Sequence, residues 1–177
     1  NEALKEPLFD SLNAVVNAGS YLSQAGKQFN QITQGLSEIT KLFFKAHSEN
    51  LIHEKDLPKS LTEEIKKYIP LIQSAASLLE KGGEEIASIP KSLIPKDLQE
   101  RFEFAQKALS TLVDIVDTLL KDTPAILALM GDSEPHRFLI LLQNNSELRP
   151  SGGFIGNYMI LEINDGYLTK NEVVDTY

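Results

Sequence analysis

A polar loop with residue types suited to binding an anion occupies residues 143–154. It places Glu147 and Arg149 close to the glycine pair Gly152 and Gly153, directly after the apolar run FLILL. A guanidinium can bind two oxygens of a phosphate or carboxylate at once, and the backbone N–H groups of Ser151 to Gly153 could form an anion nest. Loops fixed by a buried strand often carry binding sites. One interpretation of the loop is therefore an anion-binding site.

A structural interpretation accounts for the same loop. Asn144 and Asn145 favour a turn that ends the strand. In the binding interpretation, these two residues and Ser151 are further candidates for contact with the ligand. In the structural interpretation Arg149 pairs with Glu147 or with carbonyl groups at the end of the sheet, and the glycines permit positive φ. The sequence leaves both interpretations open.

No set of residues for catalysis or metal binding accompanies this loop. Ser151 is not in a GxSxG motif, and no histidine follows it. His47 and His53 flank two glutamates, but their spacing matches no helical pair of metal ligands. We assign no catalytic residue, and we expect no metal site and no cofactor.

The loop and the strand before it resemble a bacterial family known as domain of unknown function 4012. Members carry an apolar strand and then three short motifs, present here as Gln143, Asn144, Asn145; Glu147, Leu148, Arg149; and Gly152, Gly153, Phe154. The resemblance is close over roughly residues 131–177. It implies an envelope protein with one transmembrane helix near its N-terminus and the remainder outside the cytoplasm. It implies no activity.

The same loop has a weaker likeness to cell-wall phosphotransferases of the LytR, CpsA and Psr type. In those enzymes arginines hold a lipid-linked pyrophosphate, and acidic residues hold magnesium in the same pocket. This sequence offers Arg149, Arg137, Glu147 and Asp175. Three functional hypotheses follow: a module that binds an anionic wall or surface polymer or its lipid carrier, a phosphotransferase acting on lipid-linked pyrophosphate polymers, and a non-catalytic structural or sensory bundle.

Composition narrows the partners. The formal charge is −8, from 25 acidic and 17 basic residues, and this argues against nucleic acid because phosphate binding depends on a concentrated positive field. There is no cysteine, which excludes disulfides and thiolate metal sites. The chain begins at Asn1, so we expect an excised piece of a longer protein that the resemblance implies is anchored upstream.

The longest periodic segment covers residues 8–46. Six residues follow one another at intervals of seven: Leu8, Val15, Leu22, Phe29, Leu36 and Phe43. This spacing predicts a long helix with its apolar seam on that row. Gly19 and Gly26 lie on the neighbouring row, where we expect another helix to approach closely. Such a seam also allows homo-oligomerisation through the helical region.

Three further helices are expected before residue 131. Ser60 and Glu63 form a capping-box pattern, Pro70 should kink or split the helix that follows, and Gly82 and Gly83 should end it. The segment IPKSLIP predicts an extended crossover to a third helix, after which Pro124 should open a short fourth one. Helices with one apolar face each must pack together, which predicts a long antiparallel bundle for residues 1–131.

Strands replace helices after this point. The predicted strands are FLILL, FIGNYMILEI and YLTKNEVVDTY, and the last two are separated by the hairpin sequence Asn164, Asp165 and Gly166. We therefore expect an α+β chain, in which residues 132–177 begin a small sheet-containing α/β module. Because three strands need further partners or a helical cover, we expect the sheet to continue beyond Tyr177.

Overall fold

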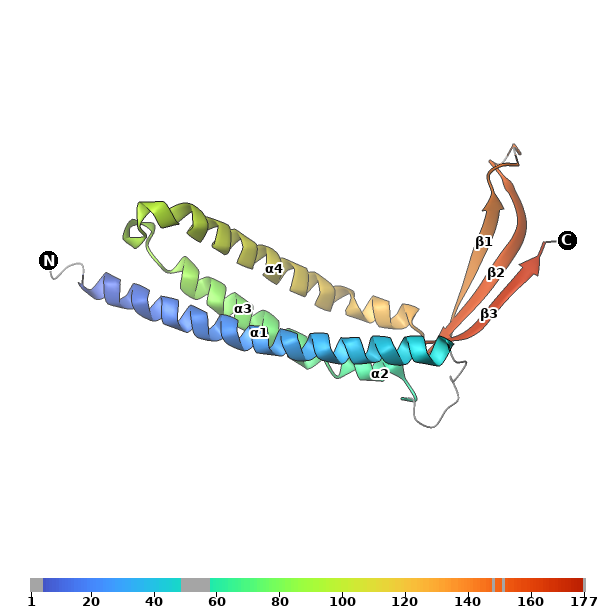
Figure 1. Ribbon diagram of the computed structural model, residues 1–177, viewed down its shortest axis with the longest axis horizontal. Coiled ribbons are helices and arrows are strands. Elements are labelled where there is room, and N and C mark those ends of the chain that lie inside the picture. The colour runs from blue at the N-terminus through green and yellow to red at the C-terminus, as the bar shows by residue number, and fades with distance from the viewer. Residues whose placement is uncertain (1–4, 49–57, 148, 151, 177) are drawn as a thin grey trace. The chain divides into compact units, whose positions relative to one another are not determined.

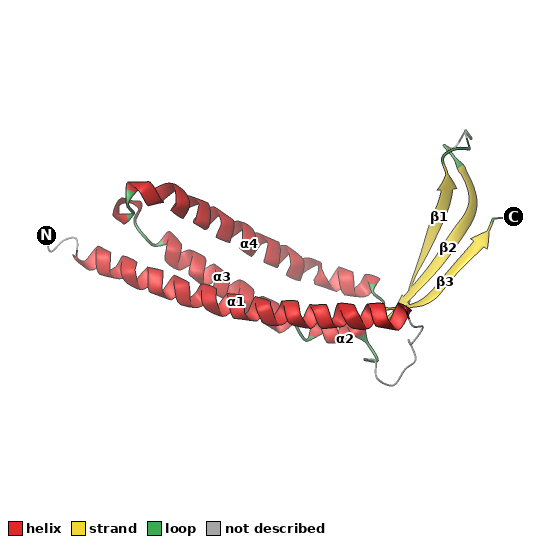
Figure 2. Cartoon of the chain, viewed as in Figure 1, coloured by secondary structure: helices red, strands yellow, loops and turns green. Residues whose placement is uncertain are grey.

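The computed structural model describes residues 5–48, 58–147, 149, 150 and 152–176, with the side chains of residues 46–48 left aside. Long helices are followed by a three-stranded antiparallel sheet (Figures 1 and 2), which confirms the α+β prediction. The elements are α1 (Lys5–Ser48), α2 (Leu61–Lys66), α3 (Ile69–Ala87), the 3₁₀ helix η2 (Lys91–Leu93), α4 (Lys96–Leu129), β1 (His136–Asn144), β2 (Phe154–Asn164) and β3 (Tyr167–Asp175).

The chain divides into two compact units. The first unit comprises residues 1–35 and 67–122, and the second comprises residues 36–66 and 123–177. Both α1 and α4 contribute to both units. The change from helices to strands does fall near residue 131, between Leu129 and His136. The domain boundary that we expected there stays a prediction.

Three helices pack together in the first unit. Its buried cluster joins Ala25 of α1, Ala76 and Leu79 of α3, and Val116 of α4, with Leu22, Phe29, Ile72, Leu78, Leu109, Val113 and Leu120 packed around it. Burying apolar area of this kind is the main favourable contribution to such a bundle.

The buried row of α1 differs from the one that we predicted. Ser11, Ala18, Ala25 and Ile32 form a buried row, with Ala14 and Gly35 buried beside it. Leu22 and Phe29 are half-buried, and Leu8, Val15 and Leu36 are exposed. The buried row lies three positions further along each heptad and consists mainly of small residues. Seven-residue spacing alone does not decide between such adjacent rows, because both repeat with the same period.

Within one chain, the expectation of close approach at Gly19 and Gly26 is wrong. A Cβ atom built at either glycine would meet no heavy atom of the described residues within 4 Å. The close approach occurs instead at Gly35, where a Cβ would stand 2.0 Å from ring atoms of Tyr68. Gly35 is also buried, unlike the other two.

Some helix ends also differ from the prediction. Pro70 lies in the first turn of α3, so the expected split at this proline is confirmed. Gly82 and Gly83, however, do not end α3, which continues to Ala87. Pro124 lies inside α4 and does not open a separate helix. Packing explains why α3 has a glycine at position 82 and continues past it, since a Cβ there would meet Leu22 at 3.1 Å.

The sheet follows the predicted strands closely. Its order is β1-β2-β3, with Arg137 opposite Glu162 and Leu139 opposite Ile160. The two-residue turn between β2 and β3 has positive φ at Asp165 (52°) and Gly166 (83°). Positive φ at both central residues is the geometry that suits the twist of a hairpin.

The hairpin turn of the second unit is held by several backbone hydrogen bonds. Asp165 N–H donates to the Gly131 carbonyl at 3.0 Å, Gly166 N–H donates to the Met130 carbonyl at 2.8 Å, and Leu61 N–H donates to the Asp165 carbonyl at 2.8 Å. Gly131 has φ 75°, and a Cβ there would stand 2.2 Å from the Ile163 carbonyl oxygen. The end of α4, the start of α2 and the hairpin are therefore fixed to one another.

Candidate functional site

The loop after β1 begins with a turn built by Asn144. Its side-chain oxygen accepts a hydrogen bond from Ser146 N–H at 3.0 Å, and its amide donates to Glu147 Oε1 at 3.5 Å. An asparagine side chain that binds backbone two residues ahead mimics a turn and ends strand pairing. Asn145 lies in the same turn. The predicted turn role of Asn144 is thus confirmed.

Arg149 lies across this loop on an aromatic ring. Its guanidinium carbon is 4.9 Å from the centroid of the Phe154 ring, and its nearest terminal nitrogen is 3.9 Å from Glu147 Oε2. The side chain is 55% exposed. An ion pair of this length and exposure contributes little to stability, whereas the aromatic face orients the guanidinium.

The two glycines have different roles. Gly152 has φ 105° and donates its N–H to the Arg149 carbonyl at 2.9 Å. This N–H therefore points into the turn rather than toward a ligand. Gly153 is buried, and a Cβ there would stand 2.6 Å from Gln143 Nε2 and 2.9 Å from the Asn144 carbonyl oxygen. Ser151, the other expected contributor to an anion nest, lies outside the described residues.

Arg137 is placed quite differently from Arg149. Its Nε and its terminal nitrogen donate to Glu162 Oε2 at 3.2 and 2.6 Å across the β1–β2 ladder. Thr169 donates a hydrogen bond to Glu162 Oε1 at 3.2 Å. The hydrogen bonds from Arg137 and then from Thr169 hold the pKa of the Glu162 carboxyl below its usual value. The structure therefore does not join Arg137 to Arg149 in one arginine cluster.

A second charged group, which the sequence did not suggest, fixes the hairpin junction. Lys66 Nζ lies 2.6 Å from Asp132 Oδ1 and 2.8 Å from Glu63 Oε1. The hydrogen bonds from Lys66 and then from Thr62 lower the pKa of Asp132, and the hydrogen bond to Asp132 is the main cause that raises the pKa of Lys66. Lys66 and Asp132 are 66 residues apart in sequence, so no local motif could have revealed this ion pair.

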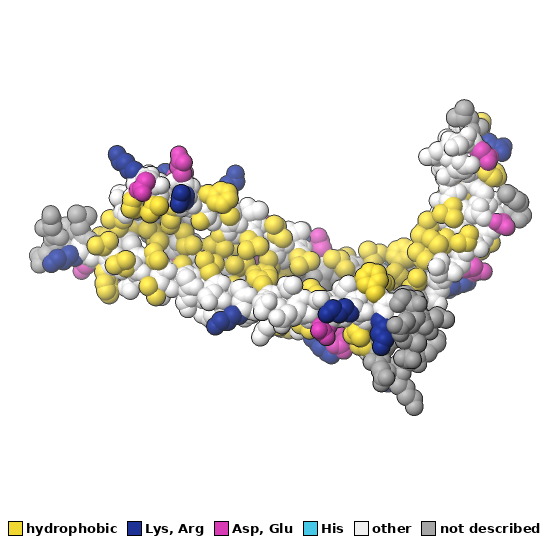
Figure 3. All heavy atoms as spheres, viewed as in Figure 1, with side chains coloured by type: hydrophobic (Ala, Val, Ile, Leu, Met, Phe, Trp, Pro, Cys, Tyr) yellow, Lys and Arg dark blue, Asp and Glu magenta, His cyan; other side chains and the backbone are white. Residues whose placement is uncertain are grey.

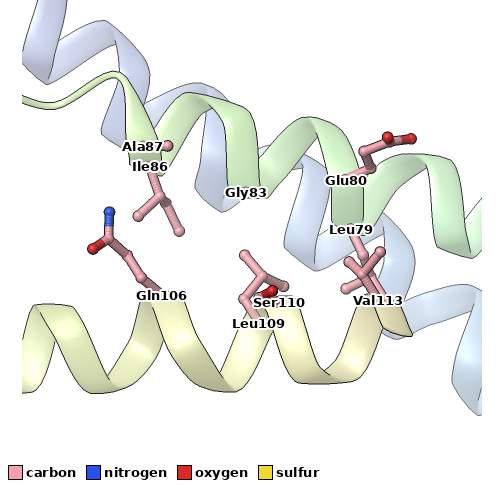
Figure 4. A pocket seen from close by; sticks show the side chains of 9 residues that line it. All are labelled: Leu79, Glu80, Gly83, Ile86, Ala87, Gln106, Leu109, Ser110 and Val113. Carbon is pink, nitrogen blue, oxygen red and sulfur yellow. The ribbon is translucent and has the colours of Figure 1, made fainter. Parts of the chain in front are cut away.

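An apolar groove of about 270 Å³ lies between α3 and α4 in the first unit (Figure 4). The side chains of Ile86, Leu109 and Val113 project into the space between the two helices, whereas Glu80 points away from it. Gln106 and Ser110 supply its polar groups. The groove continues the apolar contact between the helices, and nothing in its lining orients a particular ligand.

The described residues also bear on metal binding and on membrane crossing. Among them, no three or more His, Cys, Asp or Glu side chains are grouped so that they could hold a metal ion. His53 and both flanking glutamates lie outside the described part of the chain, as does the side chain of His47. None of the described helices is both long and apolar enough to cross a membrane.

One known family matches part of the chain, over residues that include the sheet. No curated protein and no solved structure matches the chain. The segment that matches the family begins three residues before β1 and includes the whole sheet and the Arg149 loop. The match confirms the resemblance drawn from the three short motifs. Residues 133–177 match the family described as protein of unknown function (DUF4012).

Proposed function

We propose that this chain is a non-catalytic binding module of a bacterial envelope protein, and that its β1–β2 loop binds an anionic group of a wall or surface polymer outside the cytoplasm. The extracytoplasmic location rests on the family resemblance. The binding role rests on the loop itself. The phosphotransferase and the purely structural bundle remain alternatives, and no observation favours phosphoryl transfer over binding.

The observation that carries the proposal is the setting of Arg149. Its guanidinium lies on the Phe154 ring, is more than half exposed, and has its nearest carboxylate oxygen at 3.9 Å. A guanidinium held by an aromatic face loses less side-chain freedom when it binds, and its planar fork matches two oxygens of a phosphate or carboxylate. Arg137 lacks this setting because Glu162 already occupies it.

The experiment compares the two arginines, with pyrophosphate as the probe. Arg149→Lys keeps the charge but loses the fork, so we expect pyrophosphate to bind about tenfold or more weakly in a calorimetric titration. Thermal stability should stay within about 0.5 kcal/mol of the parent, as for most exposed sites. Arg137→Lys is the matched control and should leave pyrophosphate binding unchanged.

Two outcomes contradict the proposal. If the parent does not bind pyrophosphate, the loop is not an anion site for this chemistry. If Arg149→Lys instead lowers the free energy of unfolding by more than about 1 kcal/mol, Arg149 is a structural clamp whose acceptors lose a partner.

A further inference from the structure

An exposed apolar face runs along the first part of α1. Leu8, Leu12, Val15 and Val16 follow one another at helical spacing and are 51%, 57%, 56% and 70% exposed. Gly19, Ser23 and Gly26 continue the same side of the helix, and both glycines are open to solvent. This face lies beside the buried row of Ala18 and Ala25, not on it. We name these seven residues the α1 face.

A second exposed apolar face runs along α4. Phe104, Leu112 and Ile115 are 74%, 40% and 58% exposed, and Ala108 lies between them at helical spacing. Val116, which points into the core of the same unit, is 4% exposed. We name Phe104, Ala108, Leu112 and Ile115 the α4 face. In Figure 3 hydrophobic side chains gather over α1 and α4 on one side of the first unit.

The two faces complement each other in size. Gly82 lies against Leu22 and Gly83 against Leu109, so residues 22 and 109 lie at about the same level of the bundle. Helices α1 and α4 run in the same direction (Figure 1). Counting along both helices at equal rise then brings Gly26 level with Val113, next to Leu112. Phe104 and Leu112 of the α4 face therefore lie near the levels of Gly19 and Gly26 of the α1 face.

The charges beside the two faces are also opposite. Lys5 and Lys27 border the α1 face at helical spacing. Asp97 and Asp122 stand seven residues before Phe104 and seven residues after Ile115. Arg101 and Lys107 are cations beside the α4 face, and Glu100 is a further acidic residue beside it. Association of an α1 face with an α4 face would thus bring predominantly unlike charges together.

We propose that these faces bind a second copy of this chain in a two-fold dimer, with α1 of each copy packed against α4 of the other. The two-fold axis is parallel to the helices, so that residues at equal levels of the two copies meet. A two-fold axis makes both contacts at once, because residue i of one copy then meets residue j of the other and the reverse. Exposed apolar faces bordered by charges are typical of interaction surfaces. The dimer proposal is independent of the proposal that the Arg149 loop binds an anion, and the two are tested separately.

Sedimentation equilibrium of the whole chain tests the dimer. We expect the parent to dimerise, and Ile115→Lys and Gly26→Leu each to raise the dissociation constant at least tenfold. Ser77→Lys is the control, since it adds the same charge at an exposed position of α3. Circular dichroism checks that each variant keeps the parent's helix content. A parent that stays monomeric, or Ser77→Lys weakening the dimer as much as Ile115→Lys, overturns the proposal.

Disulfide trapping tests which faces meet. The chain has no cysteine, so each introduced thiol is the only one present. A mixture of Gly26→Cys and Leu112→Cys chains should form a mixed disulfide dimer on mild oxidation faster than either chain does alone. Ser77→Cys mixed with Leu112→Cys should not. Equal trapping in all mixtures contradicts the α1-to-α4 arrangement. Binding of monomeric parent to lipid vesicles, lost in Ile115→Lys, would assign the faces to a membrane instead.

Discussion

Arg137 and Arg149 differ in what surrounds the guanidinium, and this decides which of them can bind a ligand. Arg137 donates twice to Glu162, while Arg149 lies on Phe154 with Glu147 at 3.9 Å. The loop motifs made Arg149 and Glu147 visible in the sequence. The partner of Arg137 was not visible, because Glu162 comes opposite it only through the β1–β2 register.

Glu147 is expected to oppose the binding of an anion at Arg149. Replacing it in Glu147→Gln removes a negative charge near the guanidinium while keeping the side chain's shape. We expect pyrophosphate affinity to rise roughly threefold to tenfold, because one surface charge at this range is worth on the order of 1 kcal/mol. Calorimetric titration measures the change.

Glu134→Gln is the matched control for Glu147→Gln, since it removes the same charge outside the loop. It should change pyrophosphate affinity less than Glu147→Gln. Equal effects of the two substitutions would mean that net charge, and not the setting of Arg149, controls anion binding.

At the scale of elements, propensity predicted where strands and turns occur but not where helices end. The two strand-like segments and the Asn164–Gly166 turn between them were sufficient to predict the hairpin. Gly82 and Gly83 were expected to end α3, but contact with Leu22 and Leu109 continues the helix through both. Tertiary packing commonly overrides helix propensity in this way.

Alanine substitutions at Gly35 and Gly19 of α1 make a matched pair of stability tests. Gly35→Ala should lower the free energy of unfolding by about 1 to 3 kcal/mol, because its methyl group would overlap the Tyr68 ring. In a single chain the new methyl group of Gly19→Ala meets no described atom within 4 Å, so this substitution should raise the stability of the monomer by about 0.5 to 1 kcal/mol through helix propensity. Denaturant unfolding of both variants measures the difference. If both variants become more stable, Tyr68 moves aside without cost and the contact is not tight.

At the scale of the whole molecule, acid should remove one identified contribution to stability. The pKa of Asp132 is lowered in the folded state, so its ion pair with Lys66 stabilises above the unfolded pKa of about 4 and is lost as pH falls through the folded value. Lys66 has a raised pKa, so its contribution is complete below its unfolded value and is lost only in strong alkali, as pH rises through the folded value.

Asp132→Asn should therefore be less stable than the parent at pH 7, and the gap should narrow as the pH falls below about 4. Denaturant unfolding across this pH range measures both trends. Asp114→Asn, an exposed aspartate of α4, is the control and should follow the parent at every pH. A gap that stays constant down to strong acid would show that Asp132 acts through its shape and not its charge.

The sequence could predict the fold class and the Arg149 loop because both depend on residues close together in the chain. It could not predict the buried row of α1, since Ala18 and Ala25 have no obvious advantage over Val15 and Leu22. The neighbours from other helices, Ala76 and Leu79 of α3 and Val116 of α4, decide which row is covered. The Lys66–Asp132 pair was invisible for the same reason.

Helix α1 is a single helix of 44 residues whose first part belongs to the first unit and whose last part belongs to the second. Its backbone hydrogen bonds run without interruption through the division at Gly35. Opening one unit must therefore fray the helix toward the other or stop at a costly new helix end. Amide hydrogen exchange along α1 should reveal this as protection that changes gradually through residues 30–40, without an abrupt step. The two units would then share part of their unfolding free energy, although their cores are separate.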